Sequence, residues 1–167
     1  MAKPNWMEEL AENWFKIRGY HTELHVRVPP VSRELDLLAF NDDEFVMIEL
    51  QMNVSNRKKT AEYLAEKFTD FDKIPDNPKY ANIASKLKIR RIFISDAKRD
   101  FADLLRKDNI EYLYKEDLYL KILKSIEPYV ANERWPFPDD SPVRMLYDLA
   151  LWGFINAGAC VQRVTKP

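Results

Sequence analysis

The chain has 167 residues, 46% of them hydrophobic and 13% aromatic, which is enough to bury a substantial core in one domain. The formal net charge of −1 excludes a uniformly basic nucleic-acid-binding protein, so any such surface must be local. The single cysteine, Cys160, excludes a disulfide framework and favours a reducing, cytoplasmic setting. We find neither a signal-peptide type of N-terminus nor the roughly 18 uncharged apolar residues of a membrane span, so no membrane association is expected.

A helix and a strand are predicted first in chain order. Residues 4–18 carry apolar side chains at helical spacing, and Gly19 stands where a helix commonly stops. Residues 20–28 alternate apolar and polar side chains, which indicates a strand, and the prolines at positions 29 and 30 end it. We expect His21 and His25 on an outer face of this strand, because two histidines without a nearby cysteine make a weak zinc site.

A β-hairpin is predicted next, within residues 33–51 (RELDLLAFNDDEFVMIELQ). Residues 34–40 and 45–51 each alternate with a period of two, and the polar residues between them supply the turn. One face of the hairpin is apolar throughout, whereas the other is apolar near the turn and acidic at its far end. The acidic end is unusual, because a sheet that is buried on both faces is expected to be apolar on both.

The register of this hairpin brings two acids together. With the turn at its centre, Asp36 lies opposite Glu49, at roughly 5 Å, and Glu34 lies opposite Gln51. Facing carboxylates repel each other and are costly to bury unpaired, so a positive group is expected between Asp36 and Glu49. Two carboxylates with a backbone carbonyl and waters suit Mg²⁺ or Mn²⁺. Phosphodiester hydrolysis is the reaction class that most often needs such a site.

Three helices and two strands are predicted in the middle of the chain. The helices span residues 55–74, 97–107 and 118–130, and the strands span residues 89–95 and 110–114. Asp96 is expected to cap the second of these helices, and the inner side of the first is expected to carry Ala61, Tyr63, Leu64, Phe68 and Phe71. The element order α-β-β-β-α-β-α-β-α predicts an α/β fold with a mixed central β-sheet flanked by helices. The opening run of three strands disfavours a flavodoxin-like or receiver-like domain.

The C-terminal part differs in composition from the rest. Residues 1–130 form the predicted core domain, and residues 131–167 comprise a proline-rich connector followed by an apolar helix at residues 143–155. This helix carries more apolar side chains than one buried face needs. We therefore expect it to pack either against the core or in a homodimer interface.

The opening helix and the hairpin together resemble the PD-(D/E)xK nuclease superfamily, and within it the Holliday-junction-resolvase-like and small uncharacterised nuclease branches. Glu8 stands eleven residues before Gly19-Tyr20, as in the opening helix of that branch. Residues 34–39 (ELDLLA) match the family's Glu-Ile-Asp-Leu-Ile-Ala segment, and residues 48–51 (IELQ) match its Val-Glu-Val-Lys strand. The resemblance covers residues 5–115 in element order and implies a restriction-endonuclease-like fold.

The resemblance also implies a function, that of a metal-dependent nuclease that hydrolyses phosphodiester bonds, with DNA favoured over RNA. Asp36, Glu49 and the backbone carbonyl of Leu50 would hold Mg²⁺ or Mn²⁺. Gln51 would orient the attacking water, and Glu8 would assist a second metal or order the shell. Auxiliary roles are expected for Glu34, Lys58 and Lys59.

Gln51 departs from the family pattern, which places a lysine there. Glutamine can hydrogen-bond water but brings no positive charge. Three interpretations stay open: glutamine supports catalysis, Lys58 or Lys59 of the next helix reaches back, or the chain is an inactive nuclease-fold domain that binds nucleic acid or assembles with a partner. The basic residues expected to contact nucleic acid are Arg33, Arg57, Lys58, Lys59, Arg91 and Lys98.

Overall fold

The structure, a computed structural model, describes residues 5–27, 33–84, 87–132 and 142–151. Contacts group the chain into two compact units, Tyr20–Lys115 on the one hand and Met1–Gly19 together with Glu116–Pro167 on the other. The two ends of the chain thus belong to the same unit. The predicted domain boundary at residue 130 stays a prediction.

The unit Tyr20–Lys115 contains a five-stranded mixed sheet with the strand order β1-β2-β3-β4-β5. The strands are β1 (His21–Val26), β2 (Leu35–Phe40), β3 (Glu44–Gln51), β4 (Lys88–Ser95) and β5 (Ile110–Tyr114). Strand β2 pairs antiparallel with both β1 and β3, whereas the pairs β3–β4 and β4–β5 are parallel. These features confirm the predicted α/β class and mixed sheet.

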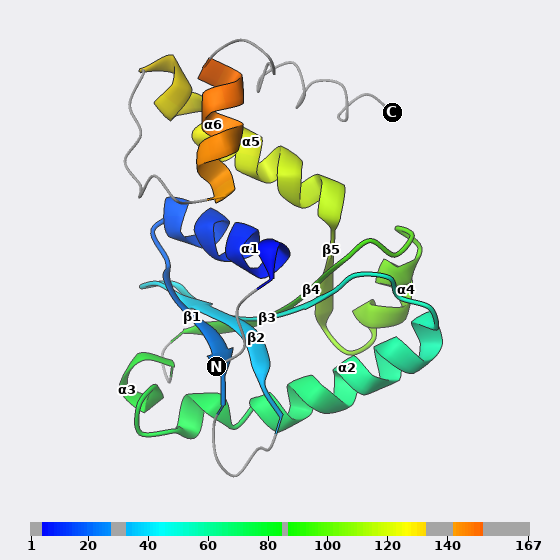
Figure 1. Ribbon diagram of the computed structural model, residues 1–167. Coiled ribbons are helices and arrows are strands. Elements are labelled where there is room, and N and C mark those ends of the chain that lie inside the picture. The colour runs from blue at the N-terminus through cyan, green and yellow to red at the C-terminus, as the bar shows by residue number, and fades with distance from the viewer. Residues whose placement is uncertain (1–4, 28–32, 85–86, 133–141, 152–167) are drawn as a thin grey trace. The chain divides into compact units, whose positions relative to one another are not determined.

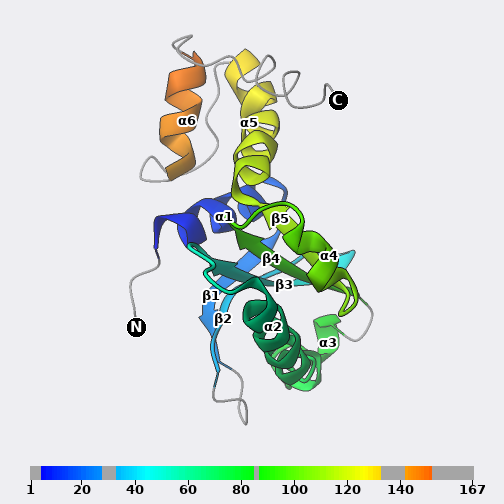
Figure 2. The same ribbon diagram turned by 90° about the vertical axis from the view of Figure 1, so that its right-hand side faces the viewer.

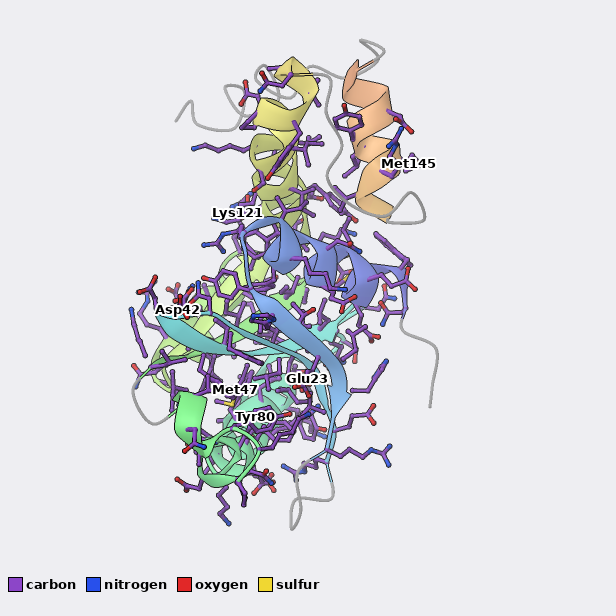
Figure 3. The ribbon with its side chains drawn as sticks, turned by 90° about the vertical axis from the view of Figure 1, so that its left-hand side faces the viewer. Glu23, Asp42, Met47, Tyr80, Lys121 and Met145 are labelled. Atoms are coloured by element: carbon purple, nitrogen blue, oxygen red, sulfur yellow. The ribbon has the colours of Figure 1, made fainter. Side chains whose placement is uncertain are left out.

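The hairpin of β2 and β3 has the predicted register. Leu37 pairs with Ile48 and Phe40 with Phe45, and the side chain of Asn41 accepts hydrogen bonds from the next residues of the turn, at whose tip Asp42 lies (Figure 3). Side chains of both hairpin faces are buried near the turn. The predicted alternation of the hairpin is therefore confirmed.

The helices of this unit are α2 (Arg57–Phe71), α3 (Ala81–Ala84) and α4 (Phe101–Arg106), with a 3₁₀ turn at Ile74–Asp76. The side chain of Asn56 caps α2 by accepting a hydrogen bond from the Lys59 N–H, at 3.1 Å. Helix α2 crosses one face of the sheet, and α4 packs beside it (Figures 1 and 2). The core between them includes Leu38, Phe45, Met47, Leu64, Phe68, Phe71, Phe93, Phe101 and Leu105.

Two expectations about these helices are wrong. The helix expected from residue 97 begins only at Phe101, because the carboxylate of the expected cap, Asp96, accepts a hydrogen bond from the Asn53 N–H instead, at 2.8 Å. Tyr63, expected on the inner side of α2, is 46% exposed, and Lys67 is buried there in its place. The apolar pattern alone therefore does not predict correctly which side chains of α2 face the sheet.

The other unit contains α1 (Trp6–Ile17), α6 (Pro142–Leu151) and, beyond its first residue, α5 (Lys115–Ala131). Trp6 stacks on Tyr119 with ring centroids 6.4 Å apart, which joins α1 to α5. In α6, Val143 and Tyr147 are buried, and Met145 is 64% exposed (Figure 3). The proline-rich connector and the end of the predicted helix, residues 152–155, lie outside the described residues.

Within the described parts of the chain, no helix combines the length and the apolar character needed to cross a membrane.

Candidate functional site

Asp36 and Glu49 meet at the open end of the β2–β3 hairpin, as the register predicts. Their carboxylates replace backbone partners there: Asp36 Oδ2 accepts a hydrogen bond from the Leu50 N–H at 2.8 Å, and Glu49 Oε1 accepts one from the Asp36 N–H at 3.3 Å. Glu49 is only 5% exposed, whereas Asp36 is partly buried. The two acids therefore form a corner that is tied to the backbone of both strands.

Lys67 of α2 supplies the positive charge that this corner requires. Its ammonium donates to Glu49 Oε2, and the residue is 6% exposed. The ammonium also lies 5.9 Å from the ring centroid of Tyr63 and 5.8 Å from that of Phe71. A lysine is almost never this buried unless it is paired. The three groups form one electrostatic unit, named here the acid–lysine corner and consisting of Asp36, Glu49 and Lys67.

The sequence held a signal for Lys67 that apolar patterning missed. Residue 67 is three positions after Leu64 and four before Phe71, both on the buried side of α2. A lysine in the apolar stripe of a helix that packs on a sheet carrying buried acids is itself an indication of pairing. The predicted alternatives, Lys58 and Lys59, are exposed in the first turn of α2, and Lys67 makes the contact with Glu49.

The pKa values of both acids are raised. Burial is the main cause for Glu49, and the neighbouring charge of Asp36 adds to it, so that the pKa rises from 4.5 to about 8 despite the opposing effect of Lys67. Burial likewise raises the pKa of Asp36, opposed by the Leu50 N–H and by Lys67. One ammonium therefore does not offset the cost of burying two carboxylates in this corner. A further positive charge would stabilise their ionised forms.

His25 and Glu34 extend the charged cluster along the sheet. His25 Nδ1 lies 3.0 Å from Glu34 Oε1, and Glu34 also accepts a hydrogen bond from Arg27 at 2.7 Å. The side chain of His25 is only 15% exposed, so the expectation of an outer-face position is wrong for this residue, whereas His21 is exposed as expected. The cause is the backbone of His25, which adopts a left-handed φ of 55° and so breaks the alternation of β1.

The remaining predicted site residues are placed as follows. Gln51 is exposed at the end of β3. Glu8 belongs to the other unit, where it accepts a hydrogen bond from the Asn5 N–H at 3.0 Å in a capping box at the start of α1. The spacing Asn5-x-x-Glu8 is a sequence signal for such a box, so this role was open to prediction. Assistance of catalysis by Glu8 stays a prediction.

The donor set of the corner fits a hard divalent cation. The carboxylates of Asp36 and Glu49 and the carbonyl of Leu50 are oxygen ligands, which Mg²⁺ and Mn²⁺ prefer. The pKa values of the two acids are raised chiefly because burial disfavours their ionised forms, a cost that such an ion would offset. Across the described ranges, no group of three or more His, Cys, Asp or Glu side chains forms a metal cluster, so waters would complete the shell.

Basic side chains gather where the parallel strands β3, β4 and β5 end. The loop after β3 and the loop after β4 are joined by the Asn53–Asp96 hydrogen bond and by an ion pair between Arg57 and Asp100. The side chain of Arg99 lies over the ring of Tyr114, 5.1 Å from its centroid. The set, named here the basic edge, comprises Arg57, Lys58, Lys59, Lys98, Arg99 and Lys115. Two of its six cations are paired with acids of these loops: Arg57 with Asp100, and Lys115 with Asp96 at 4.0 Å.

Arg33 and Arg91 are paired with acids of α2 or its C-cap. Arg33 pairs with Glu66 at 2.7 Å and with Asp70 at 3.2 Å. Arg91 pairs with Asp72 at 2.6 Å. Four of the six residues predicted to contact nucleic acid thus belong to the basic edge, and Arg99 and Lys115 join them.

Comparison with known proteins adds a fold likeness. No family model matches the sequence, and a search of curated proteins gives no match. The structure is similar to the crystal structure of a protein of unknown function, AF1548, with a TM-score of 0.51 and 18% sequence identity. The match covers 68% of this chain and 63% of that chain, so it spans less than two thirds of the neighbour. At this identity the likeness shows the fold alone.

Proposed function

We propose that the chain is a metal-dependent nuclease that hydrolyses phosphodiester bonds, with DNA as the favoured substrate. The observation that carries the proposal is the acid–lysine corner, in which two carboxylates and an ammonium converge at the end of a β-hairpin. Buried clusters of titratable groups with shifted pKa values are characteristic of active sites. Two of its members, Asp36 and Glu49, also belong to the segments that resemble the PD-(D/E)xK nucleases.

Each group has a distinct role in this proposal. Asp36, Glu49 and the carbonyl of Leu50 hold Mg²⁺ or Mn²⁺, which when bound lowers the pKa of a coordinated water and neutralises phosphate charge. Gln51 follows Glu49 by two residues on the same strand and hydrogen-bonds the attacking water. Lys67 supplies the positive charge that Gln51 lacks, from the helix rather than from the strand. Glu8 is assigned at most an auxiliary role, because capping already employs its carboxylate.

The basic edge is the proposed substrate-binding surface. It begins directly after β3, the strand that carries Glu49 and Gln51, and continues across the ends of β4 and β5. Phosphate groups of a nucleic acid attract clustered lysine and arginine side chains regardless of sequence. A substrate strand that follows this edge passes the acid–lysine corner.

Cleavage assays test this proposal directly. Wild type is incubated with plasmid, single-stranded and branched DNA and with RNA, in Mg²⁺, Mn²⁺ or EDTA. Asp36→Asn and Glu49→Gln are the key variants, because amides keep the hydrogen-bond acceptors but remove the metal-binding charge. We expect cleavage by wild type in metal and none by either variant. Equal activity in all three proteins would refute the proposal.

A catalytically inactive nuclease-fold domain is the second candidate, and a specific observation favours it. Lys67 already pairs with Glu49, and Gln51 stands in place of the family lysine, so the corner is stable as a purely structural unit. Such a domain binds nucleic acid through the basic edge, or assembles with a partner, without hydrolysis. It would retain DNA binding in Asp36→Asn, and its melting temperature would not respond to Mg²⁺ or Mn²⁺.

A further inference from the structure

Both oxygens of Glu49 accept a hydrogen bond in the metal-free corner. Glu49 Oε2 accepts from the Lys67 ammonium, and Oε1 accepts from the Asp36 N–H. Asp36 Oδ2 accepts from the Leu50 N–H. A divalent ion that is bound by both acids through Glu49 Oε2 therefore competes with Lys67 for that oxygen.

Lys67 and a divalent cation compete for these carboxylates. Two cations in contact with the same buried carboxylate repel each other strongly, because the surroundings screen them poorly. Lys67 has a long flexible side chain, and the rings of Tyr63 and Phe71 flank its ammonium at 5.9 and 5.8 Å. Tyr63 is 46% exposed, so the side adjacent to it leads toward solvent.

We propose that Lys67 is an exchangeable internal cation, which holds Glu49 in the metal-free protein and leaves it when a divalent metal binds. The inference rests on the proposed metal site at Asp36 and Glu49. Displacement leaves the ammonium beside the site, where it can contact a substrate phosphate. Metal binding and the release of Lys67 from Glu49 then occur together. The complete site, with metal bound and Lys67 in contact with a phosphate, therefore forms only when both metal and substrate are present.

Metal affinity tests the exchange without any assay of activity. Mn²⁺ binding is measured at one fixed pH by titration calorimetry and by the loss of the free-ion EPR signal. Lys67→Met removes the competing charge at similar volume, so it should bind Mn²⁺ more tightly than wild type by on the order of tenfold or more. Lys67→Arg keeps the charge, and Lys121→Met removes an exposed charge outside the proposed site, so both should stay close to wild type.

A second measurement uses the wild-type protein and does not depend on the folding of a variant. Amine-directed labelling with mass spectrometry should show Lys67 protected without metal, because it is 6% exposed, and modified severalfold faster in saturating Mg²⁺. Lys121, exposed on α5 (Figure 3), is the internal control and should not respond.

The outcomes separate this inference from the proposed function. If Lys67→Met binds Mn²⁺ no more tightly than wild type, or if Mg²⁺ binds without altering the labelling of Lys67, the exchange is refuted and the nuclease proposal stands. If both signatures are found but no nucleic acid is cleaved, the exchange stands and the nuclease proposal fails. If neither wild type nor Lys67→Met binds metal, both are refuted.

Discussion

At the scale of single residues, the acid–lysine corner shows how burial and pairing set the behaviour of charged groups. Burial raises the pKa of both acids, the charge of Asp36 raises that of Glu49 further, and the charge of Lys67 opposes both increases. Lys67 reduces the cost of burying the two acids but does not cancel it. The corner is consequently sensitive both to pH and to the loss of any one member.

The raised pKa of Glu49 predicts a specific pH dependence of stability. Between pH 4.5 and about 8, the folded protein retains a proton that the unfolded chain has released. The free energy of unfolding therefore falls as the pH rises through this window, by up to about 1.4 kcal/mol per pH unit. Urea unfolding of the metal-free protein from pH 5 to 9 measures this slope. In Glu49→Gln the contribution is absent, and an unchanged slope in that variant would assign the effect elsewhere.

Divalent metal should reverse this trend, because a metal ion binds the ionised carboxylates and thus releases the proton of Glu49. Mn²⁺ affinity is expected to rise with pH up to about 8, the pKa of Glu49 in the metal-free protein, and to level off above it. Titration calorimetry at pH 6.5 in buffers of different ionisation enthalpy measures the released proton. An observed enthalpy that does not depend on the buffer would contradict the prediction.

Residue-level prediction succeeded for the acids and failed for the lysine, for a physical reason. Asp36 and Glu49 each stand between two apolar residues of a predicted strand, so the period-two pattern identifies them directly. Lys67 follows the opposite logic: lysine in a helix is solvent-exposed by default, and only its partner across the fold makes it buried. His25 shows the same limit, since a left-handed backbone inside a strand has no counterpart in the alternation of side chains.

At the scale of elements, α2 is decisive because it carries Lys67 and covers one face of the sheet. Its position depends on a start at Asn56 and on the apolar residues that pack against the strands. The sequence predicted this helix and all five strands in their order along the chain, since each has a clear period and a polar or proline-containing boundary. Helix ends were less predictable: α4 starts late because Asp96 bonds to a neighbouring loop rather than to its own helix.

Removal of the N-cap should loosen α2 without altering the chemistry of the corner. In Asn56→Ala the Lys59 N–H loses its acceptor, so the free energy of unfolding is expected to drop by about 1 kcal/mol. Ser55→Ala, at the exposed neighbouring position, is the matched control and should change stability little. Chemical denaturation measures both. A loss of the same size in the two variants would show that the cap contributes nothing.

At the scale of the whole molecule, charge is distributed unevenly between the basic edge and the rest of the chain. The overall charge of −1 hides a local excess of cations, which composition alone cannot reveal because it requires the ends of three strands to meet at one edge. The structure sorts the basic residues by their partners: Arg33 and Arg91 are held by acids, whereas Lys58, Lys59 and Lys98 are exposed.

Salt dependence of DNA binding should identify the basic edge. Fluorescence anisotropy in Ca²⁺ or EDTA gives the logarithmic slope of affinity against salt concentration. Lys59→Ala and Lys98→Ala should each weaken binding and reduce the size of this slope by about 1, because each removes one phosphate contact. Lys121→Ala, on α5, is the control and should leave the slope unchanged. Equal slopes in all four proteins would place the binding surface elsewhere.

The hydrogen bonds at the open end of the β2–β3 hairpin have a consequence for how this sequence can change over evolutionary time. Asp36→Ala should cost about 1–3 kcal/mol through the unpaired Leu50 N–H, whereas Asp36→Asn keeps an acceptor there. In a relative under no selection for hydrolysis, positions 36 and 49 would still require side chains that accept a hydrogen bond. Asparagine at position 36 satisfies the sheet and removes a carboxylate from the proposed metal site, so by Asp36→Asn a relative could lose the proposed activity and keep its architecture. Glu49→Gln, in contrast, would leave the buried Lys67 ammonium without its partner.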